Sequence, residues 1–177
     1  MARFDEVRAT FWEDGRHGVR PALTDEAVRE AESVLGVALP ADLLVLLRAR
    51  NGGVVSSERD AFPTTRPTSW SESHVPFDEL TGIGEHAGMT SLLDSAYLVE
   101  EWGLPSPIVL LSGDGHTWIA LDYRSCGPYG EPSVTWFDVE RDEELALAPD
   151  FRSFVEGLTS EGTFDVPAAP GPAQFRA

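Results

Sequence analysis

Residues 23–53 read LTDEAVREAESVLGVALPADLLVLLRARNGG and predict two helices joined by a short turn. Thr24 suits the N-cap of a first helix over residues 24–36, because its hydroxyl can accept a hydrogen bond from a backbone N–H that the helix leaves unpaired. Gly36 tolerates the left-handed backbone that ends many helices. One face of this helix is apolar, which is typical of an amphipathic helix at the surface of a core. The apolar positions are Val28, Ala31 and Leu35.

The second helix starts near Pro40, which suits a first helical position because its fixed φ is already helical. Residues 43–47 are all apolar, so this helix is expected to be buried on every side. Asn51-Gly52-Gly53 supplies residues that tolerate left-handed backbone, and we expect it to end the helix.

The rest of the chain changes its period from helical to alternating. Residues 56–76 are rich in Ser, Thr and Pro and are predicted to form a long loop. After it we expect a short strand over residues 77–83, a helix over 91–102, strands over 108–111, 118–123, 134–139 and 145–148, and a last helix capped by Asp150. Helices followed by a meander of strands indicate an α+β fold rather than alternating β–α units.

Length and composition are consistent with one globular domain. The chain has 177 residues, 42% of them hydrophobic, and its single cysteine, Cys126, excludes an intramolecular disulfide. All 13 basic residues are arginine, which excludes every chemistry that needs a lysine. No apolar run approaches the roughly 20 residues of a membrane span, and residues 1–18 lack the apolar core of a secretory signal. The expected compartment is therefore the cytoplasm.

The net charge of −17 is unevenly distributed. Residues 1–66 hold nine arginines and eleven acids, whereas residues 67–177 hold four arginines and nineteen acids, and residues 67–123 contain no arginine. Such a balance argues against nucleic acid and anionic membranes as partners, since both are polyanions. It favours either a basic protein partner or simply a well-solvated surface.

Several motifs suggest chemistry but fit a structural role better. Residues 82–87, GIGEHA, match a dinucleotide fingerprint, yet no buried strand precedes them. Asp114 and His116 could offer two metal ligands, but a Gly- and Asp-rich segment is the ordinary way to close a hairpin. Cys126 has no histidine near it in sequence, and the carboxylate pair Glu100-Glu101 fits a solvated helix face. We therefore expect no catalytic residue, no metal and no cofactor, and a binding protein rather than an enzyme.

The order of short motifs resembles the SUKH superfamily, the Smi/Knr cell-wall-regulator-like domains. The resemblance covers roughly residues 20–160. Its motifs are Leu23-Thr24, Glu32, Leu35-Gly36, Leu39-Pro40, Asn51-Gly52-Gly53, Ser112-Gly113-Asp114-Gly115 before Trp118, Leu121-Asp122-Tyr123, Pro132, Val134 and the pair Phe151 and Phe154. The family often carries an aromatic just after Leu-Pro, where this chain has Leu43 and Leu44.

The resemblance implies a single α+β domain with a curved, mostly antiparallel sheet flanked by helices. We expect residues 1–19 to be an N-terminal extension, residues 20–160 the SUKH-like domain, and residues 161–177 a Pro/Ala-rich tail. Many bacterial members are thought to be immunity proteins that neutralise a toxin domain of a polymorphic toxin system. A non-catalytic regulator or scaffold of the Smi/Knr type is the alternative. The sequence leaves the oligomeric state open.

The predicted partner is a protein, a toxin domain with a basic cleft. Acidic residues of the arginine-free stretch would attract such a cleft, and large aromatic side chains would anchor the contact. A large aromatic in a polar loop is either a lid over the core or a contact residue, and for Trp70 the lid interpretation is favoured over the contact interpretation. The candidate partner-binding residues are Trp70, Asp78, Glu79, Glu85, Glu100, Glu101 and Tyr129.

Overall fold

The computed structural model describes residues 2–85 and 88–165. The α-helices are α1 (Phe4–Thr10), α2 (Asp25–Leu35), α3 (Ala41–Ala49), α4 (Ser95–Glu101) and α5 (Phe151–Gly157), with 3-10 helices η1 (Leu92–Asp94) and η2 (Glu161–Phe164). The strands are β1 (Gly53–Val54), β2 (Ala61–Pro63), β3 (His74–Pro76), β4 (Glu79–Leu80), β5 (Ile108–Gly113), β6 (Thr117–Asp122), β7 (Ser133–Asp138) and β8 (Glu143–Ala148).

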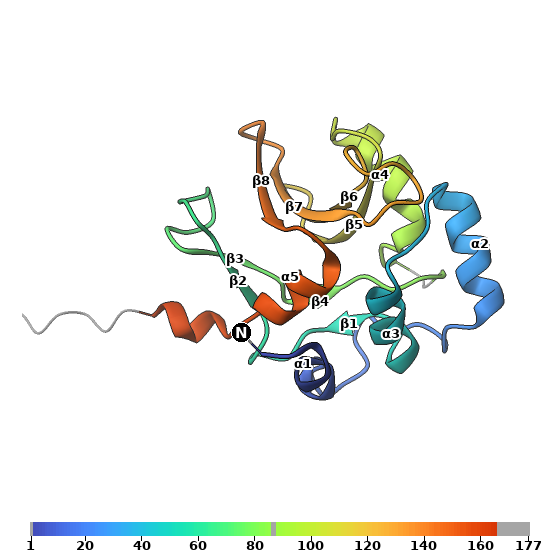
Figure 1. Ribbon diagram of the computed structural model, residues 1–177, viewed down its shortest axis with the longest axis horizontal. Coiled ribbons are helices and arrows are strands. Elements are labelled where there is room, and N and C mark those ends of the chain that lie inside the picture. The colour runs from blue at the N-terminus through green and yellow to red at the C-terminus, as the bar shows by residue number, and fades with distance from the viewer. Residues whose placement is uncertain (1, 86–87, 166–177) are drawn as a thin grey trace, which may run out of the picture.

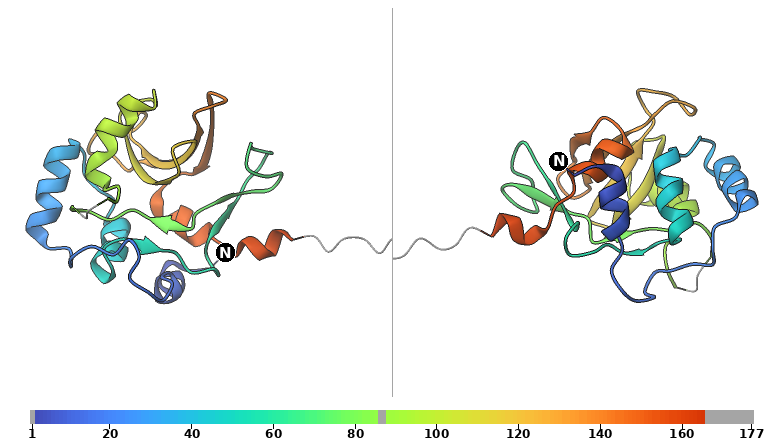
Figure 2. Two further views of the ribbon diagram at one scale, coloured as in Figure 1. Left: turned by 180° about the vertical axis from the view of Figure 1, so that it is seen from behind. Right: turned by 60° about the horizontal axis from the view of Figure 1, so that its bottom comes forward.

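The centre of the fold is an antiparallel sheet of four strands in the order β5-β6-β7-β8. Each strand pairs with its neighbour in sequence, so the sheet is the meander that the alternating pattern predicts. The sheet curves, and the helices lie on its two sides (Figures 1 and 2). The predicted α+β fold class is confirmed.

The two helices of residues 23–53 form for the predicted local reasons. The Thr24 hydroxyl accepts a hydrogen bond from the backbone N–H of Ala27 at 3.1 Å, and Gly36 follows α2 at φ 70°. Pro40 was predicted to be the first helical residue of α3, but its ψ of 135° is extended. Pro40 is therefore the N-cap, and the helix begins at Ala41.

The main core lies between one face of the sheet and the helices α1, α3 and α5. Side chains of all three helices are buried there against alternate residues of β5, β6 and β7. Each fully buried Leu or Phe contributes roughly 1.5–3 kcal/mol through the hydrophobic effect. Central members of this core are Leu43, Leu46, Leu47, Leu111, Leu121, Trp136, Phe151 and Phe154.

A second, smaller core covers the opposite face of the sheet. Val99 of α4 packs there against the strand residues that point away from the main core. These strand residues are Ile108, Leu110, Trp118, Ala120 and Phe137. Both faces of β5, β6 and β7 are therefore buried, which explains the long apolar run at residues 108–111.

Residues 1–19, set apart from the domain in our sequence interpretation, carry helix α1, which belongs to the main core. Phe4, Val7 and Phe11 are buried in it. The backbone N–H of Phe4 donates to a Glu156 carboxylate oxygen of α5 at 3.0 Å, and the Arg152 guanidinium lies 4.9 Å from the centre of the Phe4 ring. The apolar spacing of α1 is too short to stand out in sequence, because only two turns form.

The predicted loop over residues 56–76 is wrong, because this segment contains the antiparallel hairpin β2–β3. Ala61 pairs with Pro76, and Pro63 pairs with His74. Each strand has three residues and ends in proline, which lacks a ladder donor and is confined to strand ends and edges. Such short, proline-bounded strands leave no detectable alternation. The segment that joins them carries Trp70.

Two further segments differ in extent from their predictions. Only Glu79–Leu80 of the strand expected over residues 77–83 pairs as a strand. At the other end of the chain, residues 161–164 form η2, and the ring of Phe164 stacks on His74 of β3 at 4.4 Å between centroids. The predicted tail over residues 161–177 is therefore helical at its start, and residues 166–177 lie outside the described part.

Candidate functional site

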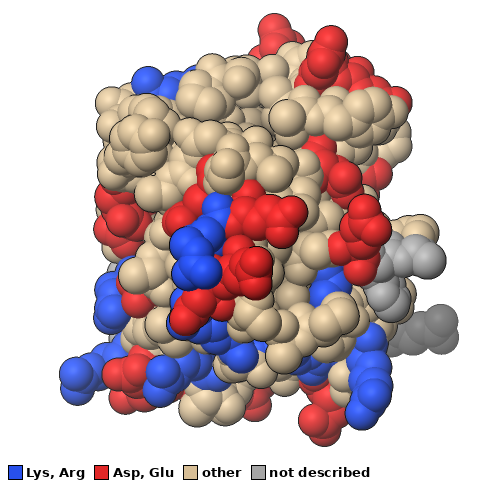
Figure 3. Space-filling view, turned by 90° about the vertical axis from the view of Figure 1, so that its right-hand side faces the viewer, with Lys and Arg blue, Asp and Glu red and all other residues tan. Residues whose placement is uncertain are grey.

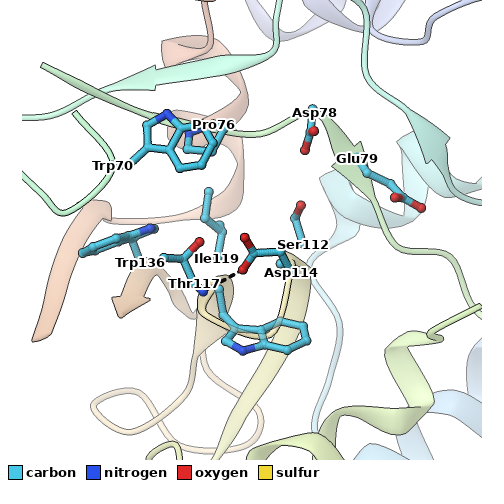
Figure 4. Close-up of a pocket in the computed structure, with 11 residues that line it drawn as sticks. Trp70, Pro76, Asp78, Glu79, Ser112, Asp114, Thr117, Ile119 and Trp136 are labelled. Atoms are coloured by element: carbon cyan, nitrogen blue, oxygen red, sulfur yellow. Dashed lines mark hydrogen bonds between the residues drawn. The ribbon is translucent and has the colours of Figure 1, made fainter. Parts of the chain in front are cut away.

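A cavity of about 250 Å³ opens where the turn between β5 and β6 meets the β2–β3 hairpin and the start of β4. In Figure 4, Trp70 and Trp136 lie on one side of the cavity, and the oxygen-bearing side chains of Asp78, Glu79, Ser112 and Asp114 lie on the other. The residues that line it are Trp70, Pro76, Asp78, Glu79, Ser112, Gly113, Asp114, Thr117, Trp118, Ile119 and Trp136. This set contains three carboxylates and no basic side chain.

The aromatic side of the cavity combines one exposed and two buried rings. Trp70 is 49% exposed, whereas Trp118 and Trp136 are 6% and 1% exposed. Among the described residues, the indole nitrogens of Trp118 and Trp136 have no hydrogen-bond partner. In Figure 4 the Trp136 nitrogen lies at the ring edge that faces the other lining residues. An unpaired buried donor costs about 1–3 kcal/mol, and the indole nitrogen of Trp12, which does not line the cavity, is unpaired among the described residues as well.

The acidic side of the cavity is formed by Asp78, Glu79 and Asp114. In the described part of the chain, no hydrogen bond or ion pair engages the Asp78 carboxylate. Asp114 Oδ1 accepts from the backbone N–H groups of His116 and Thr117 at 2.9 and 2.8 Å. Burial raises the pKa of Asp114, but these donors outweigh burial, and the pKa lies below its ordinary value. Asp114 is therefore a carboxylate at neutral pH.

Glycine at position 113 allows the Trp118 ring to pack against the end of the β5–β6 hairpin, where both residues line the cavity. A Cβ there would lie 2.3 Å from the Trp118 ring, a separation that real contacts do not reach. The missing side chain lets the indole pack flat across the hairpin end. The glycine turn of residues 112–115 thus shapes the cavity as well as closing the hairpin.

The acidic side is held in place by the Asn51-Gly52-Gly53 motif. Asn51 is 4% exposed, and its side-chain amide donates to the carbonyl oxygens of Pro21 and Ile83, both at 2.8 Å. Its Oδ1 accepts from the Ile83 N–H at 2.9 Å. Gly53 then pairs with Leu80, so β1 aligns β4 and the acids beside it.

The cavity brings together three of the seven predicted partner-binding residues. Trp70, Asp78 and Glu79 line it, although Figure 4 shows the Glu79 side chain turned away from its centre. Burial lowers the pKa of Arg20, and the negative charge of Glu79, followed by that of Asp94, opposes this shift. Glu79 is thus partly balanced by an arginine.

The other predicted residues lie elsewhere on the surface. Glu85 is exposed, Tyr129 is 86% exposed, and neither lines the cavity. Glu100 and Glu101 belong to α4, where Glu100 borders a separate hollow of about 440 Å³ between α2 and α4. As partner-binding residues, all four remain predictions.

Sequence reasoning missed eight of the eleven lining residues of the cavity, among them Ser112, Asp114, Trp118 and Trp136. The first two were assigned only to a turn, and the tryptophans only to strands. A signal existed in part, because Asp114 lies in the arginine-free stretch with Asp78. No sequence pattern could show that the β2–β3 hairpin brings Trp70 opposite this turn.

Charge is also segregated on the surface. On the face of Figure 3, which includes the α2 side of the molecule, arginines gather in the lower half, while charged atoms of the upper half are mostly acidic. The chain's net charge of −17 is therefore not spread uniformly. Separation of this kind creates a local field stronger than the mean charge would give.

The residues that the sequence offered as a nucleophile or as metal ligands make structural contacts instead. Among the described residues, Cys126 Sγ has only carbonyl oxygens as hydrogen-bond partners, that of Tyr123 at 3.9 Å and that of Gly127 at 3.3 Å. His116 Nδ1 lies 2.8 Å from a Glu140 carboxylate oxygen. Within residues 2–85 and 88–165, no group of three or more His, Cys, Asp or Glu side chains is placed to hold a metal ion. The described helices include none that is long and apolar enough to cross a membrane.

The GIGEHA motif has a packing role at its first glycine. A Cβ on Gly82 would lie 2.5 Å from the Asn51 carbonyl oxygen, so only glycine fits beside Asn51. His86 and Ala87, the last two residues of the motif, lie outside the described residues. The first glycine of the fingerprint match is therefore explained by the close contact between the backbones of Gly82 and Asn51.

Comparison with known proteins identifies the family. The sequence model of the SMI1/KNR4 family (SUKH-1) matches residues 22–157, which is most of the chain. The protein belongs to this family, and the resemblance predicted from its motifs is confirmed. No curated protein matches the sequence.

Proposed function

We propose that this protein is an immunity protein that binds and neutralises a cognate toxin domain, acting by binding rather than by catalysis. The observation that carries the proposal is that one cavity is lined both by the exposed Trp70 and by Asp78, whose carboxylate has no partner among the described residues. Tryptophan is enriched among residues that dominate binding energy, and it acts best next to a pocket. The proposed partner has a basic, cleft-bearing surface.

Electrostatics supports a basic partner. The arginine-free stretch of residues 67–123 supplies all three carboxylates of the cavity, so no arginine from that stretch can neutralise them. Complementary charge speeds the encounter of two proteins, and salt screens it over about 8 Å at physiological ionic strength. The association rate should therefore fall steeply as salt is added, with a smaller change in the dissociation rate.

The metal-ligand and nucleophile candidates that the sequence offered are held in structural contacts, which supports binding over catalysis. Asp114 is engaged by its own turn, and His116 is paired with Glu140. In the described part of the chain, Cys126 Sγ hydrogen-bonds only to carbonyl oxygens, which cannot act as the base that a thiol nucleophile needs. The side chains that remain unpaired at the cavity are carboxylates and indoles, which recognise a partner rather than react with it.

The experiment is protection from toxicity. The gene adjacent to this one is expressed under a tight promoter with and without the full chain, and growth is followed. Protection together with co-purification of the two products supports the proposal. If the neighbour's product is not toxic, and the chain protects against no toxin encoded nearby, the Smi/Knr-type regulator becomes the better account.

A matched pair of variants ties protection to the cavity. Trp70→Ala removes the exposed ring, whereas Tyr97→Ala removes a ring on α4 that is 65% exposed and is not among the residues that line the cavity. We expect Trp70→Ala to lose protection at low expression and Tyr97→Ala to retain it. Equal loss in both variants would place the interface elsewhere.

A further inference from the structure

The cavity is chemically one-sided, and this restricts what can fill it. Its walls supply carboxylates from Asp78 and Asp114 and the faces of three tryptophans, with no cation among the lining residues. Asp114 Oδ2 accepts no hydrogen bond within the described part of the chain. Flat aromatic faces and carboxylates both attract a cation that can leave water.

The buried indoles add a second requirement. The nitrogens of Trp136 and Trp118 are donors, and neither has an acceptor among the described residues. Native proteins leave few such groups unpaired, and each one calls for an explanation. The Trp136 nitrogen is covered, so a ligand carbonyl oxygen that displaced the atoms over it would provide the missing acceptor for that donor. The occupant must therefore carry a cation and an acceptor close together.

We propose that the cavity binds an arginine side chain of the partner protein, with a backbone carbonyl of the same segment accepting from the Trp136 indole. This inference rests on the proposed function and specifies its chemistry. The guanidinium lies against Trp70 and donates to Asp78 and Asp114. The partner thus inserts one residue of a surface loop into the mouth between the β5–β6 turn and the β2–β3 hairpin.

Arginine fits these walls better than lysine does. A guanidinium is planar, so it can stack on an indole while its edge donates to a carboxylate. It is also less strongly hydrated than an ammonium, and therefore loses less on entering a cavity lined by aromatic rings. The volume of about 250 Å³ leaves room for a side chain and part of its backbone.

The test is a titration of the full chain, labelled with ¹⁵N, with Nα-acetyl-arginine amide. This probe carries a guanidinium and two carbonyl acceptors. We expect saturable shifts of the Trp136 and Trp70 indole N–H signals, with Trp12 and Trp102 unchanged. Nα-acetyl-citrulline amide has the same shape without the charge, and it should bind at least about tenfold more weakly, because the charge-assisted bonds are lost.

Variants locate the binding. Asp78→Asn and Asp114→Asn should each weaken arginine-amide binding about threefold to tenfold. Asn at position 114 keeps an Oδ1 acceptor for the turn, so the hairpin should persist. Glu58→Gln removes an exposed carboxylate away from the cavity lining and should leave binding unchanged.

Three results would overturn the inference: equal binding of the citrulline amide, shifts confined to tryptophans outside the cavity, or no shift up to the solubility limit of the probe. Each is separable from failure of the proposed function. If protection from the toxin holds and is lost in Trp70→Ala, but the arginine amide does not bind, then the partner fills the cavity with a different group. If the amide binds without any protection, the site stands and the immunity role fails.

Discussion

The side-chain amide of Asn51 engages both backbone groups of Ile83, accepting from its N–H at 2.9 Å and donating to its carbonyl at 2.8 Å. Ile83 lies just beyond β4, and the Asn51 amide provides the two hydrogen bonds that a neighbouring strand would otherwise provide to its backbone. The same amide also reaches Pro21, so three segments distant in sequence meet at one buried side chain. The conformation of the acidic wall depends on this junction.

Replacing Asn51 should destabilise the fold strongly. In Asn51→Ala, the buried N–H and carbonyl of Ile83 and the carbonyl of Pro21 lose their partner. Each orphaned group costs about 1–3 kcal/mol, so the three together should cost at least about 3 kcal/mol in the free energy of unfolding, measured in urea. Asn51→Asp keeps the acceptor but not the donors, so its stability should lie between those of the wild type and Asn51→Ala. A loss below 1 kcal/mol in the alanine variant, of the order of a single ordinary hydrogen bond, would show that water replaces the amide.

Two glycines with similar backbone angles should respond differently to alanine. Gly52 has φ +86°, and a Cβ there would lie 2.7 Å from the backbone nitrogen of Gly82. Gly36 has φ +70° with no atom within 4 Å of the added carbon. Gly36→Ala should therefore cost only the left-handed strain, about 1–2 kcal/mol, whereas Gly52→Ala adds a clash between two backbones and should cost more. Equal melting temperatures for the two variants would contradict the close packing at Gly52.

Stability should fall at low pH partly through Asp122. Burial raises the pKa of this carboxylate, but hydrogen bonds from Arg124, at 2.9 and 2.6 Å, outweigh it, and the pKa lies below its ordinary value. A carboxyl whose folded pKa is below its unfolded value of about 3.9 stabilises the fold above that pH and loses this effect as the pH falls through the folded value.

The corresponding measurement compares unfolding of the wild type and Asp122→Asn across the acidic range. The difference in stability between them should shrink from roughly pH 5 to pH 2, because the wild type loses the charged pair that the variant already lacks. Asp165→Asn, an exposed site, serves as the control for general acid effects. A difference that stays constant with pH would mean that the Asp122–Arg124 pair does not contribute through its charge.

Affinity for the partner should depend on Trp70 more than on any other exposed ring. Trp70→Ala should weaken binding by about thirtyfold or more, as expected of an anchor residue, because ring contact with the partner is lost. Its effect on unfolding should be small, since the ring is half exposed. Calorimetry measures the first quantity and thermal melting the second. Parallel losses in both would identify Trp70 as a lid on the core, the other role that the sequence allows.

Local sequence signals predicted the regular elements well, because the physical causes are local. Thr24 and Asp150 cap their helices as expected, with Asp150 accepting from the Ser153 N–H at 2.7 Å. The strands from residue 108 onward also appear in the predicted order. Each of these elements is fixed by the spacing of its own apolar residues and the turn that follows.

The site was predictable only in part, because contacts between distant segments build it. Trp70 and Asp78 stood out as an aromatic in a polar loop and an acid in an arginine-free stretch. Trp136 looked like an ordinary strand residue, since only the folded structure shows that its ring lines the cavity and that its buried nitrogen has no partner among the described residues. The β2–β3 hairpin, whose prolines obscured its strands, is what places Trp70 across from the β5–β6 turn.

The most direct test of the account is the growth of cells that express the neighbouring gene's product together with the wild-type chain, Trp70→Ala or Tyr97→Ala. The account predicts rescue by the wild type and Tyr97→Ala and loss of rescue by Trp70→Ala, with all three chains folded to the same level. Rescue by all three would contradict a role for the cavity. Failure of the wild type to rescue against every nearby toxin would contradict the immunity function itself.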